Sequence, residues 1–203
     1  KTRWVFLQPV LVSMVIVIAV LLICGLSYAE YKLSVESMTL FLGPTTVALA
    51  VPLYLNLRRI RQLFWPTVTT LLVGGLVATC LGIGIAWLFG AEPLMLMSIA
   101  PKSVTSPIAM LVADQIGGIA ALAAVFVMLT GVVGAILGPS LLRIFGVHHH
   151  AAVGLALGIS AHAVGTSRAM QESEECGAFA ALAMSLMGML TAVLLPLAFV
   201  LLR

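Results

Sequence analysis

Two groups of polar side chains lie within otherwise apolar sequence, and both contain residue types that bind a small anion. The first group comprises Lys102, Ser103, Thr105 and Ser106. The second group comprises Ser160, His162, Thr166 and Arg168. Lysine and arginine attract an anion by charge, and hydroxyl groups donate hydrogen bonds to its oxygens. The imidazole of His162 changes charge near neutral pH, so His162 is the candidate for proton coupling.

The first group lies between two helix breakers, Pro101 and Pro107. Each proline removes a backbone N–H donor and disfavours helix at the residue before it, so the peptide between them is predicted to be unwound. Non-helical backbone at membrane depth persists only where protein buries it or a water-filled cavity lies beside it. The helix that begins near Pro107 would present its positive N-terminal end to that cavity, as broken helices do at transporter substrate sites.

A second interpretation of each charged residue stays open. Lys102 could extend to the membrane interface, with the two prolines merely ending helices at a loop. Arg168 could form an ion pair with Glu172, which lies one helical turn further along the chain. Neither a position at the membrane interface nor an ion pair explains His162 as easily, because it lies six residues inside a segment of small residues.

The composition places the chain in a membrane. Of its 203 residues, 62% are hydrophobic, 10 are Lys or Arg and 7 are Asp or Glu, and the mean hydropathy is +1.21. A soluble domain needs roughly a quarter of its residues charged. The apolar runs are continuous, which excludes the alternating strands of a membrane β-barrel. The net charge of +3 is scattered beside these runs, so the cations indicate topology and no nucleic-acid partner.

The apolar runs predict an all-α, polytopic protein that forms a single transmembrane domain over residues 1–203. About five regular membrane helices are expected, at residues 6–27, 38–57, 64–90, 118–145 and 178–202. Two further segments, 94–113 and 151–170, are polar and interrupted, so each either crosses the membrane or re-enters it. Residues 43–52 and 100–109 share a pattern of proline, polar, hydroxyl and valine residues, which either an internal repeat or chance explains.

The arginines at 58, 59 and 61 predict a cytoplasmic loop by the positive-inside rule, on the side that Lys1 and Arg3 also occupy. If both interrupted segments cross the membrane, Arg143 lies outside and Arg203 inside. If both are re-entrant, Arg143 lies inside and Arg203 outside. One arginine on each side does not decide between the two topologies.

No catalytic or metal-binding pattern is visible in the sequence. Cys24, Cys80 and Cys176 are isolated and have no CxxC spacing, so they predict neither a disulfide framework nor a metal site. The adjacent histidines 148–150 point in different directions on a helix, and no fourth ligand is evident. No nucleophile and base pair appears either. We therefore expect neither an enzyme nor a cofactor.

Several motifs resemble the LrgB/CidB family of bacterial membrane proteins, and the resemblance runs from about Pro9 onward. The motifs are LGPTTVALAVPLY, PKSVTSPIAM, IGGIAALAAVFVMLTGVVGAILGP and GLALGISAHAVGTSRAMQESEECGAFAALAM. The resemblance implies a multi-pass protein of the bacterial inner membrane and one more hydrophobic segment ahead of this sequence. It also implies one of two functions. Some members are described as holin- or antiholin-like regulators of murein hydrolase export and autolysis, with a small LrgA/CidA-type membrane partner.

Other relatives, including the plastid glycolate/glycerate translocator, carry small carboxylates. We expect a carrier for a small organic anion such as pyruvate or glycolate, because a lesion-forming pore needs no cations beside hydroxyls and unwound backbone. In this interpretation Lys102 and Arg168 pair with the carboxylate. The hydroxyls that would bind its oxygens belong to Ser103, Thr105, Ser106, Ser160 and Thr166. The alternative is a holin-like regulator whose polar groups form the interface of a homo-oligomer.

Overall fold

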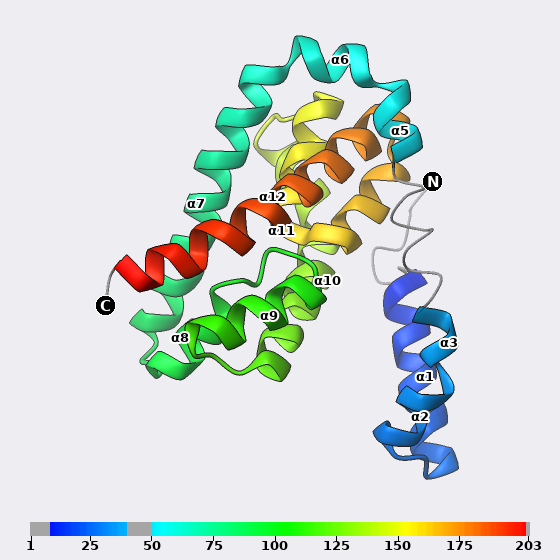
Figure 1. Cartoon of the computed structure of the whole chain (residues 1–203). Coiled ribbons are helices and arrows are strands. Elements are labelled where there is room, and N and C mark those ends of the chain that lie inside the picture. Colours follow the sequence, from blue (N-terminus) through cyan, green and yellow to red (C-terminus); the bar gives the residue numbers. More distant parts are fainter. Residues whose placement is uncertain (1–8, 40–49, 202–203) are drawn as a thin grey trace.

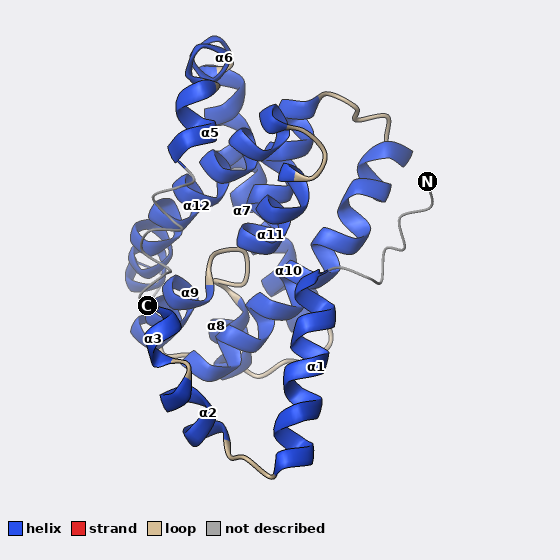
Figure 2. Ribbon diagram, turned by 90° about the vertical axis from the view of Figure 1, so that its right-hand side faces the viewer, coloured by secondary structure: helices blue, strands red, loops and turns tan. Residues whose placement is uncertain are grey.

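The computed structural model describes residues 9–39 and 50–201, and within them every regular element is a helix (Figure 2). This confirms the all-α prediction for the described residues. The repeat-like residues 43–49, together with Lys1, Arg3 and Arg203, lie outside them. The helices are α1 (Pro9–Cys24), α2 (Tyr28–Ser34), α3 (Glu36–Thr39), α5 (Ala50–Leu55), α6 (Leu57–Gln62), α7 (Phe64–Leu88), α8 (Pro93–Ile99), α9 (Ser106–Ile116), α10 (Ala120–Ile144), α11 (His150–Met170) and α12 (Glu174–Leu201).

Three of these helices, α7, α10 and α12, are long and apolar enough to cross a membrane. The first two have 25 residues each, which gives a length of about 37 Å against a hydrocarbon core of about 30 Å. They confirm the spans expected at 64–90 and 118–145, and α12 covers the one expected from 178. The expected number of about five regular helices with two re-entrant segments stays a prediction, because 40–49 lie outside the described residues.

One end of the helix bundle carries the arginines of α6, and we call it the arginine end. The Nε of Arg59 lies 3.2 Å from Oε1 of Glu175, in the first turn of α12. The same guanidinium approaches Nε2 of His149, immediately before α11, at 3.2 Å. The C-terminal end of α10 and both ends of α11 therefore lie at the arginine end. The loop before α8 and the connection from α9 to α10 lie at the opposite end (Figure 1).

Helices α8 and α9 form a hairpin that enters the bundle from the end opposite the arginines. Helix α8 stops at Ile99, and α9 begins at Ser106 with Pro107 in its first turn. The backbone from 100 to 105 is not helical, so the break predicted from the two prolines is confirmed. Pro101 and Val104 at the tip are buried, which satisfies the requirement that irregular backbone be covered by protein.

Helix α11 is a second hairpin, and its tip is His162. The backbone there has φ 42° and ψ −128°, which joins two helical arms, 150–161 and 163–170. The arms fold back on each other, because a Cβ built on Gly165 would meet the carbonyl oxygen of Leu157. Helix α12 then runs beside the first arm, with Gly154 against the carbonyl of Cys176. The expected interruption of 151–170 is thus a reversal of the chain.

Glycines let the α11 hairpin pack closely against α10 and α12. Three α10 glycines face the first arm, and a Cβ on each would lie closer to it than real Cβ atoms do. These contacts are Gly131 with the His162 ring at 2.6 Å, Gly134 with Ala161 at 2.7 Å and Gly138 with Leu157 at 2.8 Å. Small residues permit such close approach between membrane helices. The hairpin is therefore held by backbone proximity on both sides.

We predict that Gly158→Ala lowers stability by about 1–3 kcal/mol, the usual range for overpacking a close contact. A methyl group at Gly158 would meet the carbonyl oxygen of Ala180, which is backbone and cannot rotate away. Gly84→Ala is the matched control, because nothing lies within 4 Å of the position its Cβ would take. Thermal unfolding in detergent measures both variants. Equal midpoints for the two would contradict the assigned packing.

Candidate functional site

The tips of the two hairpins meet the middle of α7 and α10 around one cavity. Its volume is about 390 Å³. The cavity is lined by Ala78, Lys102, Ser103, Leu129, Thr130, Val133, Gly134 and Ser160. The structure thus brings together three residues from the two predicted polar groups: Lys102 and Ser103 from the first hairpin, and Ser160 from the second.

Lys102 supplies the positive charge of this cavity. Its Nζ donates to the carbonyl oxygen of Ala78 at 3.1 Å and to Oγ of Ser103 at 3.3 Å. Its aliphatic stem lies against Gly82, where a Cβ would be 3.0 Å from Nζ. No carboxylate in the described part of the chain lies within ion-pair distance of this ammonium group. Among the described residues, the cavity therefore holds a half-buried cation with no carboxylate beside it.

The hydroxyl groups of Ser103, Thr130 and Ser160 line the same cavity. Ser160 Oγ donates to the Ala156 carbonyl at 2.6 Å, which leaves its oxygen lone pairs to accept. Thr130 was not predicted from the sequence. It stands alone in the apolar run of α10, so only the rotation of that helix against Lys102 identifies it.

Three predicted hydroxyl ligands do not line the cavity. Thr105 is the N-cap residue of α9, and its side chain makes no capping hydrogen bond. Ser106 is the first residue of that helix. Thr166 is buried on the return arm of α11, where Oγ1 donates to the carbonyl of His162 at 2.8 Å. The expected approach of the α9 N-terminus to an anion is therefore not visible among the lining residues.

Arg168 lies near the arginine end and pairs with Glu172 one turn further on. This confirms the second interpretation of Arg168, and the arginine does not line the cavity. The reason is the reversal at His162, which carries the return arm away from Lys102. One guanidinium nitrogen, NH1, is buried without a hydrogen-bond partner among the described residues.

His162 is buried, with 2% of its surface exposed. Its Nε2 lies 2.9 Å from the carbonyl oxygen of Val127 in α10. A carbonyl only accepts, so Nε2 carries the hydrogen in this arrangement. Its Nδ1 is buried without a partner in the described structure. The ring points at α10 and does not line the cavity, so its predicted role in proton coupling stays a prediction.

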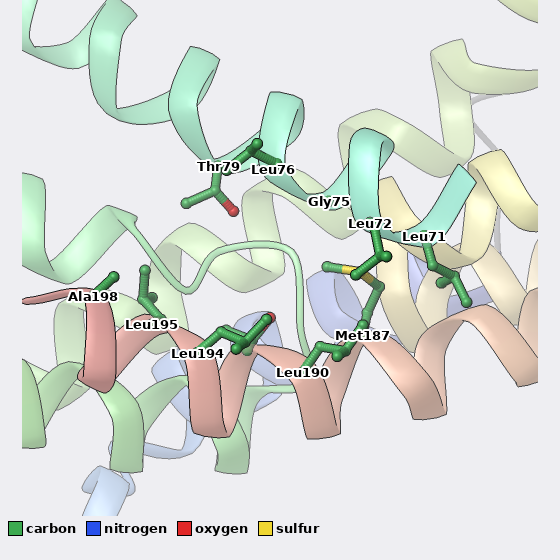
Figure 3. A pocket seen from close by; sticks show the side chains of 11 residues that line it. Leu71, Leu72, Gly75, Leu76, Thr79, Met187, Leu190, Leu194, Leu195 and Ala198 are labelled. Carbon is green, nitrogen blue, oxygen red and sulfur yellow. The ribbon is translucent and has the colours of Figure 1, made fainter. Parts of the chain in front are cut away.

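A second hollow is an apolar groove between α7 and α12 (Figure 3). Its volume is about 180 Å³. The groove is lined by Leu71, Leu72, Gly75, Leu76, Thr79, Met187, Leu190, Thr191, Leu194, Leu195 and Ala198. Its walls carry two hydroxyl groups, of Thr79 and Thr191, and no charged side chain that would attract an anion.

The described residues contain no group of three or more histidine, cysteine and acidic side chains that could hold a metal ion. Cys24 and Cys80 are exposed and Cys176 is buried, all as free thiols. His149 contacts Arg59 at the arginine end.

Comparison with known proteins gives a match to the LrgB-like family over residues 1–201. An uncharacterised protein of Haemophilus influenzae is 34% identical, over 97% of this chain and 86% of its own length. The holin-like protein CidB of Staphylococcus epidermidis is 33% identical over 94% and 83%. The antiholin-like protein LrgB of Bacillus cereus is 30% identical over 93% and 82%. No solved structure matches the chain.

We predict that Lys102→Met stabilises the isolated protein by about 1–3 kcal/mol, because an apolar side chain of similar length removes the desolvation cost of a half-buried charge that has no carboxylate partner among the described residues. Arg61→Met is the control, since an exposed arginine in α6 should change stability by less than about 0.5 kcal/mol. Thermal unfolding in detergent without added anions measures both. A lower midpoint for Lys102→Met would show that the lysine is retained for structure.

Proposed function

The chain belongs to the LrgB-like family, and from that premise we propose that this membrane protein is a carrier of small organic anions in the bacterial inner membrane. The observation that carries the proposal is the half-buried ammonium group of Lys102, which has no carboxylate partner among the described residues. A cation at this depth is costly, so such residues usually serve a substrate or ion pathway.

The cavity offers one charge and several hydroxyl groups, which suits a monocarboxylate. The carboxylate would sit beside Lys102 Nζ, replacing the weaker contact with the Ala78 carbonyl. The hydroxyls of Ser103 and Thr130 would donate to the remaining oxygens, such as the 2-oxo group of pyruvate, and Ser160 would accept from the 2-hydroxyl of glycolate. A second carboxylate would find no second cation in the cavity, so dicarboxylates would bind more weakly.

Four further residues would take part in binding or proton coupling only after the protein leaves the conformation described here. Arg168 would reach a substrate only after leaving Glu172. His162 would couple a proton only if its buried ring gains access to water. Thr105 and Ser106 would contribute if the anion moves toward the N-terminus of α9 during transport.

For topology we propose that both hairpins are re-entrant and enter from opposite faces. The α8–α9 hairpin begins and ends opposite the arginine end, whereas α11 begins and ends at it. The positive-inside rule then makes the arginine end cytoplasmic. This arrangement agrees with the second predicted topology, in which Arg143 lies inside and Arg203 outside.

The second candidate function is that of a holin- or antiholin-like regulator. The names of the relatives from Staphylococcus epidermidis and Bacillus cereus, holin-like and antiholin-like, favour it over transport. In that case the polar groups would form an interface between copies of this chain or with a small membrane partner. The carrier proposal and this one differ in whether Lys102 must bind a solute.

Uptake into sealed liposomes separates the two proposals. We expect saturable uptake of labelled pyruvate or glycolate, because the cavity binds one carboxylate at a time. Lys102→Met should reduce the uptake by at least tenfold, the usual effect of removing one charge-assisted hydrogen bond. Thr130→Val should weaken it several-fold. Thr191→Val is its matched control, since Thr191 lines only the apolar groove, and it should leave uptake unchanged.

A trapped large dye in the same liposomes reports lesions. Retained dye with Lys102-dependent uptake supports the carrier. Dye leakage that Lys102→Met does not alter would contradict the carrier proposal and support the holin-like alternative. Because the relatives are also holin- and antiholin-like in name, the assay is done with this chain alone and with any membrane partner that co-purifies.

A further inference from the structure

The two hairpin tips at the cavity are held in place to very different degrees. The α8–α9 hairpin is tied to its surroundings by Ser98, which is fully buried. Its Oγ donates to the Leu94 carbonyl at 2.7 Å and accepts from the backbone N–H of Ile119 at 2.8 Å. Lys102 adds the bond to the Ala78 carbonyl of α7. This tip is therefore fastened both to α10 and to α7.

The tip of α11 makes one hydrogen bond to α10, from His162 Nε2 to the Val127 carbonyl. Of the hydroxyls beside it, Ser160 donates to Ala156 within the hairpin, and Thr166 bonds to the His162 carbonyl and to Sδ of Met184 in α12. The other polar atom of the His162 ring, Nδ1, is buried with no partner in the described structure. A single hydrogen bond thus ties the tip to α10, and the tip also buries an unsatisfied acceptor, which is a costly arrangement.

The backbone of His162 is also strained. Its φ of 42° is the only positive value among the described residues other than glycines. Residues that hold such conformations persist only when their surroundings enforce them, and they concentrate at functional sites and switch regions. Moving the tip away from α10 would relieve the backbone strain at His162. It would also let the unsatisfied Nδ1 of His162 find a hydrogen-bond partner. The position of the α11 tip against α10 is therefore maintained against a local tendency of the tip to move away.

The surface of α10 against which the tip packs is formed by glycines. Gly131 and Gly134 of α10 face the ring of His162 and the methyl group of Ala161. Neither glycine has a side chain that blocks the hairpin, so displacement breaks the His162 hydrogen bond and the contacts that His162, Ala161 and Val164 make with α10. The arms of α11 pack more extensively on α12 through Gly154 and Gly158, and we expect them to move with it.

We propose that the α11 hairpin is the gate between the Lys102 cavity and the arginine end, and that the hydrogen bond from His162 Nε2 to the Val127 carbonyl is its latch. The α8–α9 hairpin is the fixed wall that carries the charge. His162 is thus a positioning residue that acts on Ser160, two residues earlier in the cavity lining. The identity of the admitted solute rests on the proposed function, whereas the movement itself does not.

Hydrogen–deuterium exchange of the full chain in lipid nanodiscs, without added anion, tests the latch. In the unmodified protein, amides at 160–166 should exchange faster than those at 98–105. His162→Ala should raise exchange at 160–166 and at the facing α10 residues by roughly five- to tenfold, as expected for one lost buried hydrogen bond. It should leave 98–105 unchanged. His162→Gln keeps an N–H at a similar reach and should stay within about twofold of the parent.

Ser98→Ala is the matched variant of the other hairpin, and it should raise exchange at 98–105 but not at 160–166. If His162→Ala does not fold, Gly131→Ala carries the same test, because a methyl group there would displace the His162 ring. Equal exchange at the two tips in the unmodified protein would overturn the proposal. So would a rise at both tips in the His162 variant, or no rescue by glutamine.

The outcome is independent of the uptake assay. If the latch pattern appears and no anion uptake is found, the gate stands and the carrier proposal fails. If uptake is saturable and exchange is insensitive to His162, the carrier stands and the latch fails.

Discussion

An ammonium group in the middle of an apolar helix bundle has to be solvated by the protein itself, and Lys102 depends on several parts of this fold for that. Its Nζ uses a backbone carbonyl of α7 and a neighbouring hydroxyl, and its stem needs the space left by Gly82. The lysine can reach them only because the helix is interrupted on either side of it. The break, the glycine and the second hairpin are therefore parts of one arrangement that surrounds a single charge.

In this chain the close approach of helix backbones provides the packing that large side chains provide in a soluble core. Lipid offers no hydrophobic gain from bringing membrane helices together, so packing at short range must supply it. The glycines of α10 and α11 provide that range, and α12 adds Gly177 against Met170. Side chains of the α11 hairpin fill the spaces over the α10 glycines, with Leu157 over Gly138 and the His162 ring over Gly131.

Membership of the LrgB-like family leaves two kinds of function to compare. Two of the relatives carry the names holin-like and antiholin-like, whereas our proposal from the cavity chemistry is that this chain binds an anion. Both functions involve Lys102, because a lysine with no carboxylate partner among the described residues needs a negatively charged ligand in either case. The carboxylate of a solute or of a neighbouring protein would pair with the Lys102 ammonium group by the same charge attraction.

Several features followed from the sequence because their causes are local. Pro101 and Pro107 dictate where the first hairpin breaks, and Arg168 meets Glu172 because four residues make one helical turn. The tertiary structure alone decided the rest. No proline or glycine marks the reversal at His162, so it depends on the packing of α11 between α10 and α12. That reversal brings Ser160 to Lys102, sends Arg168 away, and leaves Thr130 to be found by the rotation of a helix distant in sequence.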